Sequence, residues 1–318
     1  MIQFIVKRLA AYVPTLLIIS MVLFVAINAV PGSAAHAALG ITATAEAIAQ
    51  FERELGLDRP LYEQYWRWLA KALQGDLGMS YQAGVPVGPE LLARLPVTLE
   101  LAILSFLIAN LIAVPLGCAA AYKHQKPTDN SVILLATVMG AVPNFWLATL
   151  LILFLSLTLG WLPIGGYIPF SEDPIKNLSL MIMPAISLGV VSSALLLRIM
   201  RTNMLEVLSA DYIRTAHAKG ANQRVVIWRH ALRNALIPYL TVGGVEFSLL
   251  FGGVVIIENI FMLPGVGEMA LIGIVIRDHP LLLASVLSVA VVVLTVNLIV
   301  DILGAWLDPR QVHTAGDN

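Results

Sequence analysis

Cysteine and charged residues are scarce in this chain of 318 residues. Cys118 is the one cysteine, and Asp, Glu, Lys and Arg together make up 12% of the sequence. A single thiol excludes an intrachain disulfide and a zinc site built on several cysteines. The sequence also contains no GxxxxGK[ST] phosphate loop, no HExxH and no CxxC, and its six His are scattered. We therefore find no ATP-binding loop and no catalytic or metal-binding constellation.

Apolar residues are abundant, at 58% of the chain. They gather into six long runs, and about 20 apolar residues suffice for a helix to cross a bilayer. Because lipid offers no hydrogen bonds to the backbone, such runs must be helical. The sequence predicts an all-α integral membrane protein with six transmembrane helices. The runs are 9–30, 101–121, 131–159, 178–197, 235–257 and 281–300.

Two of these runs need comment. The third is longer than one span requires, and Pro143 followed by Asn144 predicts a kink within it. The first follows Lys7 and Arg8, as a signal peptide would, but it is longer than a usual signal core. We expect it to be kept as a membrane anchor.

Basic residues predict the orientation, because cytoplasmic loops are enriched in Lys and Arg. Six spans place both termini on one side, and 12 of the 19 basic residues fall on that side. The short loops of the opposite face carry only Lys176 and Arg277. Both termini and the segment 198–234 are therefore predicted to be cytoplasmic, and 31–98 to be extracytoplasmic.

The long outer segment 31–98 is predicted to fold into helices. Thr44 can cap a helix that ends at Gly56. A second helix is expected after Pro60, with apolar residues every four positions and with Tyr62, Trp66 and Trp68 among them. The residues alone favour a small helical cap whose aromatic side chains rest at the membrane surface. The alternative is a docking platform for an outside partner.

The inner segment 211–238 concentrates positive charge. We expect Ser209 to cap a short helix that has Asp211 in its first turn and Lys219 in its last. Gly220 then permits the left-handed backbone that ends a helix. Asn222 is predicted to cap a second helix, with Val225, Trp228, Leu232 and Leu236 on one stripe and Arg229 and Arg233 on another. An interfacial amphipathic helix explains the Arg and Trp residues but not the Gly boundary.

This segment resembles the cytoplasmic loop of ABC-transporter permeases. The matching stretches are Asp211-Tyr-Ile-Arg-Thr-Ala-His-Ala-Lys-Gly220 and Arg229-His-Ala-Leu-Arg-Asn-Ala-Leu-Ile-Pro238. The general loop has Glu-Ala-Ala, three residues and then Gly, whereas Arg214-Thr215-Ala216 stands here, as in the dipeptide/oligopeptide/nickel importer permeases. His217 replaces an Arg that is common there. The resemblance implies a coupling helix that contacts an ATPase subunit through Asp211, Arg214, Thr215, Ala216, Lys219 and Gly220.

The resemblance extends along nearly the whole chain and is closest to the first of the two permease subunits. Its further motifs occur in the family's order: Lys7-Arg-Leu, Pro31-Gly32, Leu55-Gly-Leu-Asp-Arg-Pro-Leu, Gly75-Asp-Leu-Gly-Met-Ser80, Leu95-Pro-Val-Thr-Leu-Glu-Leu101, Pro143-Asn-Phe-Trp146, Trp161-Leu-Pro163, Glu258-Asn-Ile-Phe-Met-Leu-Pro-Gly-Val-Gly267, Arg277-Asp-His-Pro280, Asn297-Leu-Ile-Val-Asp301 and Asp308-Pro-Arg310. It implies three parts: 1–30 with span 1, the loop domain 31–98, and a five-helix permease core 99–318.

The resemblance also implies an assembly in a bacterial inner membrane. Its expected members are a second homologous permease, two cytoplasmic ATPase subunits and an extracytoplasmic substrate-binding protein, with no nucleic acid. ATP and Mg would be bound on the ATPase subunits, and this chain would hold no cofactor and be no enzyme. The binding protein would dock on 31–98, which favours the docking platform over the cap. Peptides, nickel chelates, glutathione, opines and other solutes all stay open as cargo.

Glu246 is the one charged residue well inside a predicted span, so it is expected to face water or another helix rather than lipid. It and Asn144 are candidates for the translocation pathway; the alternative for Glu246 is a hydrogen-bonded role in helix packing. Two other functions are alternatives for a chain of this composition. A self-sufficient secondary transporter or channel more often shows inverted repeats and broken helices. An intramembrane enzyme needs paired groups at membrane depth, where Glu246, Asn110, Asn144 and Asn297 are the only candidates.

Overall fold

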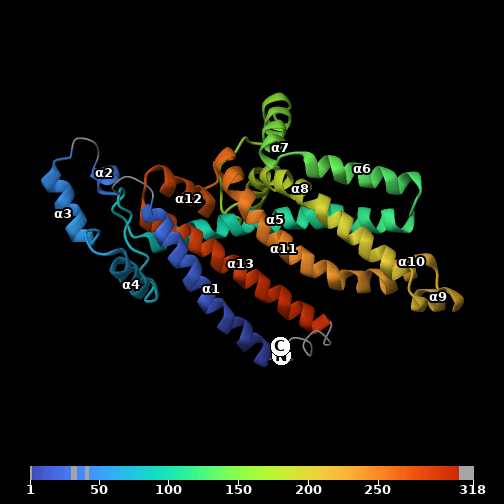
Figure 1. The fold of residues 1–318 in the computed structure, drawn as a ribbon. Helices are drawn as coiled ribbons and strands as arrows, with labels where there is room; N and C mark the ends of the chain where they lie inside the picture. The colour runs from blue at the N-terminus through green and yellow to red at the C-terminus, as the bar shows by residue number, and fades with distance from the viewer. Residues whose placement is uncertain (1, 30–33, 40–42, 308–318) are drawn as a thin grey trace. The chain divides into compact units, whose positions relative to one another are not determined.

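The computed structural model describes residues 2–29, 34–39 and 43–307, and they are almost entirely helical (Figure 1). One isolated antiparallel bridge joins Met79 and Pro86. The helices are α1 Ile2–Ala29, α2 Ala34–Leu39, α3 Ala45–Leu55, α4 Leu61–Ala72, α5 Val87–Tyr122, α6 Pro127–Ala141, α7 Asn144–Leu151, η1 Ile152–Thr158, α8 Pro174–Leu208, α9 Asp211–Ala218, α10 Gln223–Val225, η2 Val226–Ala231, α11 Leu232–Ile260, α12 Val266–Val275 and α13 His279–Leu307. The all-α prediction is confirmed.

Five helices are long and apolar enough to cross a membrane, and a bent pair brings the number of spans to as many as six. The bent pair is α6 with α7 and η1, which meet at 93° (Figure 1). Pro143 lies at the break, where it cannot donate a backbone hydrogen bond, so the predicted kink is confirmed. Several helices are longer than the apolar runs from which they were predicted. For example, α8 continues past its apolar residues through Arg198 and Arg201 to Leu208.

The described residues pack as two compact units. The first comprises residues 2–5, 100–262 and 295–307. Its central helix is α8, the most buried of the candidate spans, which packs against α6, α7 and α11. Close approach depends on small residues: a Cβ on Gly189 of α8 would lie 2.6 Å from the Ser105 carbonyl oxygen of α5. The short helix α9 follows directly after this central helix (Figure 1).

The second unit comprises residues 6–99 and 263–294. The predicted outer helices are present: the Thr44 hydroxyl accepts from the Ala47 amide at 3.3 Å, and Gly56 ends α3 with φ of 70°. The helix expected after Pro60 is α4. Its Tyr65 is buried against α1, where its hydroxyl hydrogen-bonds the Ser20 hydroxyl at 2.9 Å.

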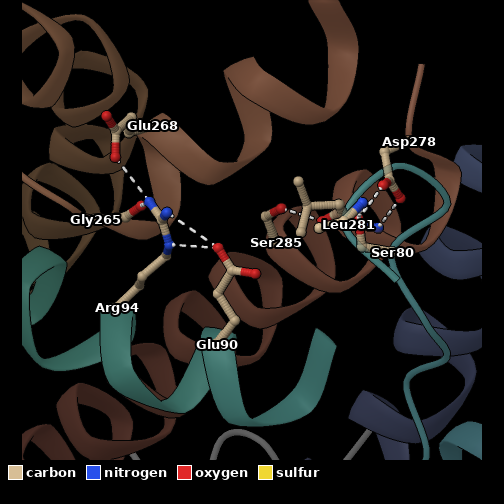
Figure 2. A network of polar contacts seen from close by, with 9 residues as sticks. Ser80, Glu90, Arg94, Gly265, Glu268, Asp278, Leu281 and Ser285 are labelled. Atoms are coloured by element: carbon tan, nitrogen blue, oxygen red, sulfur yellow. Dashed lines mark hydrogen bonds and ion pairs between the residues drawn. The ribbon is translucent and has the colours of Figure 1, made fainter. Parts of the chain in front are cut away.

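Polar contacts hold the rest of this unit together, as Figure 2 shows. Arg94 on α5 donates to Glu90 on the same helix at 3.1 Å and to Glu268 on α12 at 2.7 Å. Ser80 donates to the buried Asp278 at 2.6 Å. Burial, together with the Asp278 charge, raises the pKa of the nearby Tyr81 to about 12. The segment after α4 is thereby joined to the segment before α13.

Candidate functional site

The helix α9 occupies the range predicted for the coupling segment, but its beginning differs from the prediction. Ser209 does not cap it; the Ser209 hydroxyl donates instead to the Glu206 carbonyl, 2.7 Å away in the last turn of α8. The first turn of α9 is closed by the Ile213 amide, which donates to the Ala210 carbonyl at 3.0 Å. Ser209 cannot cap α9 because α8 extends to Leu208, and Ser209 is the C-cap residue of α8.

The end of α9 agrees with the prediction. Gly220 has φ of +80°, in the left-handed region. The Ala221 amide donates to the Ala216 carbonyl at 3.1 Å, which is the six-to-one bond of a Schellman motif. A Cβ on Gly220 would meet no atom within 4 Å. The requirement for glycine therefore comes from the backbone conformation and not from crowding.

One face of α9 is anchored and the other is exposed. Ile213 is 2% exposed and packs in the core formed by α5, α8, η2 and α11. Tyr212 accepts a hydrogen bond of 3.0 Å from Asn234 of α11. Asp211 and Arg214 approach each other at 3.6 Å, with side chains 97% and 80% exposed. Thr215 and Lys219 are exposed as well. The helix α9 therefore packs on the core through one face and presents polar side chains on the other.

The predicted stripe of the helix after Gly220 is divided between exposed and partly buried residues, because Leu232 and Leu236 pack against the core. The helix winds as a π-helix over Val226–Ala231, and Val226 and Ala231, five residues apart, are the buried positions. Val225 and Trp228, which the α-helical stripe placed together, are 41% and 57% exposed. The wider turn changes which side chains share a face, and a period of 3.6 residues cannot show it.

An ion pair that the sequence reasoning missed joins α6 to α8. Asp129 is 1% exposed, and its two carboxylate oxygens accept from Arg201 Nε at 2.6 Å and from Arg201 Nη2 at 2.8 Å. His124 Nδ1 lies 3.0 Å from the same carboxylate, and the Gln125 amide donates to it at 2.9 Å. The partners are 72 residues apart, so no local pattern marks them as a pair.

Glu246 lies on the buried seam between α11 and α8. It is 9% exposed and hydrogen-bonds Ser192 of α8. Asn144 meets the same helix farther along: its Nδ2 lies 2.6 Å from where a Cβ on Gly253 would stand. Residues 246 and 253 are two turns apart, about 10 Å, on one face of α11. Glu246 and the Asn144 side chain from α7 therefore lie along the same face of α11.

The other polar residues inside the spans form bonds between helices. Tyr239 on α11 donates to Asn110 on α5 at 2.7 Å. Ser248 on α11 donates to Asn297 on α13 at 3.4 Å. Such bonds join helices within a membrane, where water offers no competing partner. Among the residues that the structure describes, no three His, Cys, Asp or Glu side chains gather as a metal site.

Comparison with known proteins places this arrangement in a family. Residues 113–313 match the description "binding-protein-dependent transport system inner membrane component", and residues 1–102 match the N-terminal domain of the same membrane components. A relative in Brucella abortus (strain 2308), provisionally named a peptide transport system permease protein, is 40% identical over 96% of this chain and 98% of its own. The glutathione transport system permease of Salmonella paratyphi A (strain ATCC 9150 / SARB42) is 37% identical over 97% and 98%.

A solved structure shares the fold. A chain of the MetNI methionine ABC transporter aligns with a TM-score of 0.58 at 15% identity, over 69% of this chain and 96% of that one. The family matches cover most of the sequence and include α9 with its glycine end. The chain therefore belongs to the inner-membrane permeases of binding-protein-dependent ABC importers, as a multi-pass transport subunit that is not itself an enzyme.

Proposed function

We propose that this chain forms half of a translocation pathway, together with a second homologous permease, for peptides or glutathione-like solutes. The substrate class rests on the names of the relatives, which carry peptides or glutathione. Two cytoplasmic ATPase subunits drive the cycle, with ATP and Mg bound on them, and an extracytoplasmic binding protein delivers the solute. The main structural support is α9, a short helix whose charged side chains are exposed while Ile213 on its other face is buried in the core.

The polar face of α9 is the surface on which an ATPase subunit docks. Asp211, Arg214 and Lys219 supply charges of both signs for charge-assisted hydrogen bonds, and Thr215 adds a hydroxyl. Gly220 turns the chain away, whereas Ala216 packs against the core with Ile213 and supports the helix from behind. Ile213 and the Tyr212–Asn234 bond fix this helix to the core. A displacement of the ATPase surface is therefore transmitted to α8 and α11.

The whole proposal is tested by reconstituting the permease pair with its ATPase and binding-protein subunits in vesicles. We expect uptake of di- or tripeptides or of glutathione that requires both ATP and the binding protein. Uptake by the permease chains alone, driven by a proton gradient, would show a secondary transporter instead.

The orientation of the chain follows from the basic residues. We expect both termini and the segment 198–234 to be cytoplasmic, with 31–98 outside as a loop domain and 99–318 as the permease core. Single cysteines at Gln74 and Ser209, both exposed positions, are introduced in a Cys118→Ala background. In sealed cells a membrane-impermeant maleimide should label the first and not the second. Labelling of both from outside would contradict the orientation.

Glu246 and Asn144 are proposed to border the translocation pathway. Glu246→Gln keeps the shape and the hydrogen bond to Ser192 but removes the charge. We expect uptake of a lysine-containing peptide to fall about fivefold, since an ion pair in a hydrated site contributes about 1 kcal/mol. Uptake of a neutral alanine peptide serves as the matched control and should not change. Equal uptake of both peptides by the variant would leave Glu246 a packing residue.

A further inference from the structure

The helix α4 carries more apolar surface than its neighbours cover. At about 100° per residue, positions 62, 66, 69 and 73 fall within an arc of about 60°. Tyr62, Trp66 and Leu73 on this arc are 70%, 62% and 80% exposed. We call the exposed residues Tyr62, Trp66 and Leu73 the aromatic stripe; Leu69, on the same arc, packs against the buried cluster that contains Phe24 of α1.

The remaining circumference of α4 divides into two other sectors. Tyr65 and Trp68 point to α1, where both rings pack on Phe24 with centroids 5.5 and 6.2 Å away. Opposite lies a polar sector, in which Arg67 and Glu63 form an ion pair of 3.1 Å and Lys71 is exposed. The aromatic stripe lies between the sector that contacts α1 and the polar sector.

The contacts of α4 with α1 and α13 show where along these membrane-spanning helices α4 lies. Tyr65 packs in one buried cluster with Phe24 of α1 and Leu283 of α13. Phe24 is followed by only five more residues of α1, and Leu283 stands near the first residue of α13. At about 1.5 Å per residue both contacts lie roughly 7 Å from the end of a span. Interfacial helices bury their apolar face about 5–10 Å deep, so the level matches.

We propose that α4 lies in the lipid–water interface of the outer leaflet, with the aromatic stripe against phospholipid acyl chains and the polar sector toward water. Three observations agree on this partner. The stripe is continuous with a face already packed on a membrane helix, and the exposed α1 residues at the same level, Met21, Val22 and Val25, are apolar as well. Tyr and Trp are the residues that membrane interfaces favour. The charges are confined to the sector farthest from α1.

The stripe is therefore a lipid contact and not a protein-docking surface. The extracytoplasmic binding protein would then contact the polar sector of α4 or other parts of 31–98, and the stripe would be covered in every state of the transporter. The lipid contact rests on family membership, which makes α1 and α13 membrane spans, and not on the proposed substrate.

Site-directed spin labels test the proposal in the assembled transporter. Single cysteines replace Tyr62, Trp66 and Leu73 in turn in a Cys118→Ala background, and Arg67→Cys and Lys71→Cys are the matched controls on the same helix. The complex is placed in nanodiscs of phosphatidylethanolamine and phosphatidylglycerol. We expect collisions with oxygen to exceed those with a water-soluble nickel chelate at the stripe, and the reverse at the controls.

Two outcomes would overturn the proposal. Dominant collisions with the nickel chelate at Tyr62→Cys, Trp66→Cys and Leu73→Cys would place the stripe in water. A stripe that becomes protected only when the binding protein is added would assign it to that protein. Any labelled variant that fails to assemble is replaced by bimane at the same position, whose emission shifts to the blue in lipid and not in water.

Discussion

Replacement of Gly220 by valine is expected to abolish the stimulation of ATP hydrolysis by substrate-loaded binding protein. Gly220 has φ of +80°, and a β-branched residue there costs roughly 1–3 kcal/mol of strain. The least costly relief is to unwind the Schellman end, which removes the Ala221–Ala216 bond and tilts α9. The variant should still insert and assemble, because a Cβ at this position meets no atom within 4 Å. The measurement is ATPase activity of the purified complex with and without binding protein.

Two variants separate coupling from general strain. Gly160 has φ of +63° and equally open surroundings, but it lies in the turn after η1, outside both α9 and the segment 31–98. Gly160→Val should therefore carry a similar backbone strain and leave the stimulation intact. Gly220→Asn, which tolerates the left-handed region, should retain most of the stimulation. Normal stimulation in Gly220→Val would reduce the segment to a basic anchor.

Removal of the Arg201 side chain is expected to give the largest loss of stability. Arg201→Ala leaves the Asp129 carboxylate, 1% exposed, without its bidentate partner. Breaking a buried pair costs about 3–5 kcal/mol, and we expect the lower end here because His124 and the Gln125 amide still contact the carboxylate. We expect the unfolding temperature of the purified permease to fall by roughly 10 °C.

The controls for this prediction use the same chain. The pair Arg59–Glu63 is exposed, at 41% and 37% of the side chains, so Arg59→Ala should change the unfolding temperature little. The double variant Asp129→Leu with Arg201→Met removes both charges and should recover much of the loss. Arg201→Lys keeps the charge but not the two parallel hydrogen bonds, so its unfolding temperature should lie between those of the parent and Arg201→Ala. If Arg201→Ala unfolds like the parent, the pair does not hold α6 to α8.

Much of this protein follows from local sequence. Apolar runs of about 20 residues become helices because lipid provides no other partner for the backbone. Thr44, Gly56 and Gly220 act within a few residues of their own helix ends, and all three behave as predicted. The break at Pro143 could be predicted because the effect of a proline on the backbone is confined to the residues next to it. The segment 211–220 can be proposed as a coupling helix from sequence because the motif that carries its resemblance spans only ten residues.

Tertiary structure decided the rest. The Asp129–Arg201 pair and the Arg94–Glu268 pair join residues 72 and 174 positions apart, and only the packing of helices brings them together. The π-helix at Val226–Ala231 places Val226 and Ala231, five residues apart, in the core, which a period of 3.6 residues does not predict. Ser192 became the partner of Glu246 because α8 and α11 pack together. Helix formation is a property of each segment, whereas partners between helices depend on which faces meet.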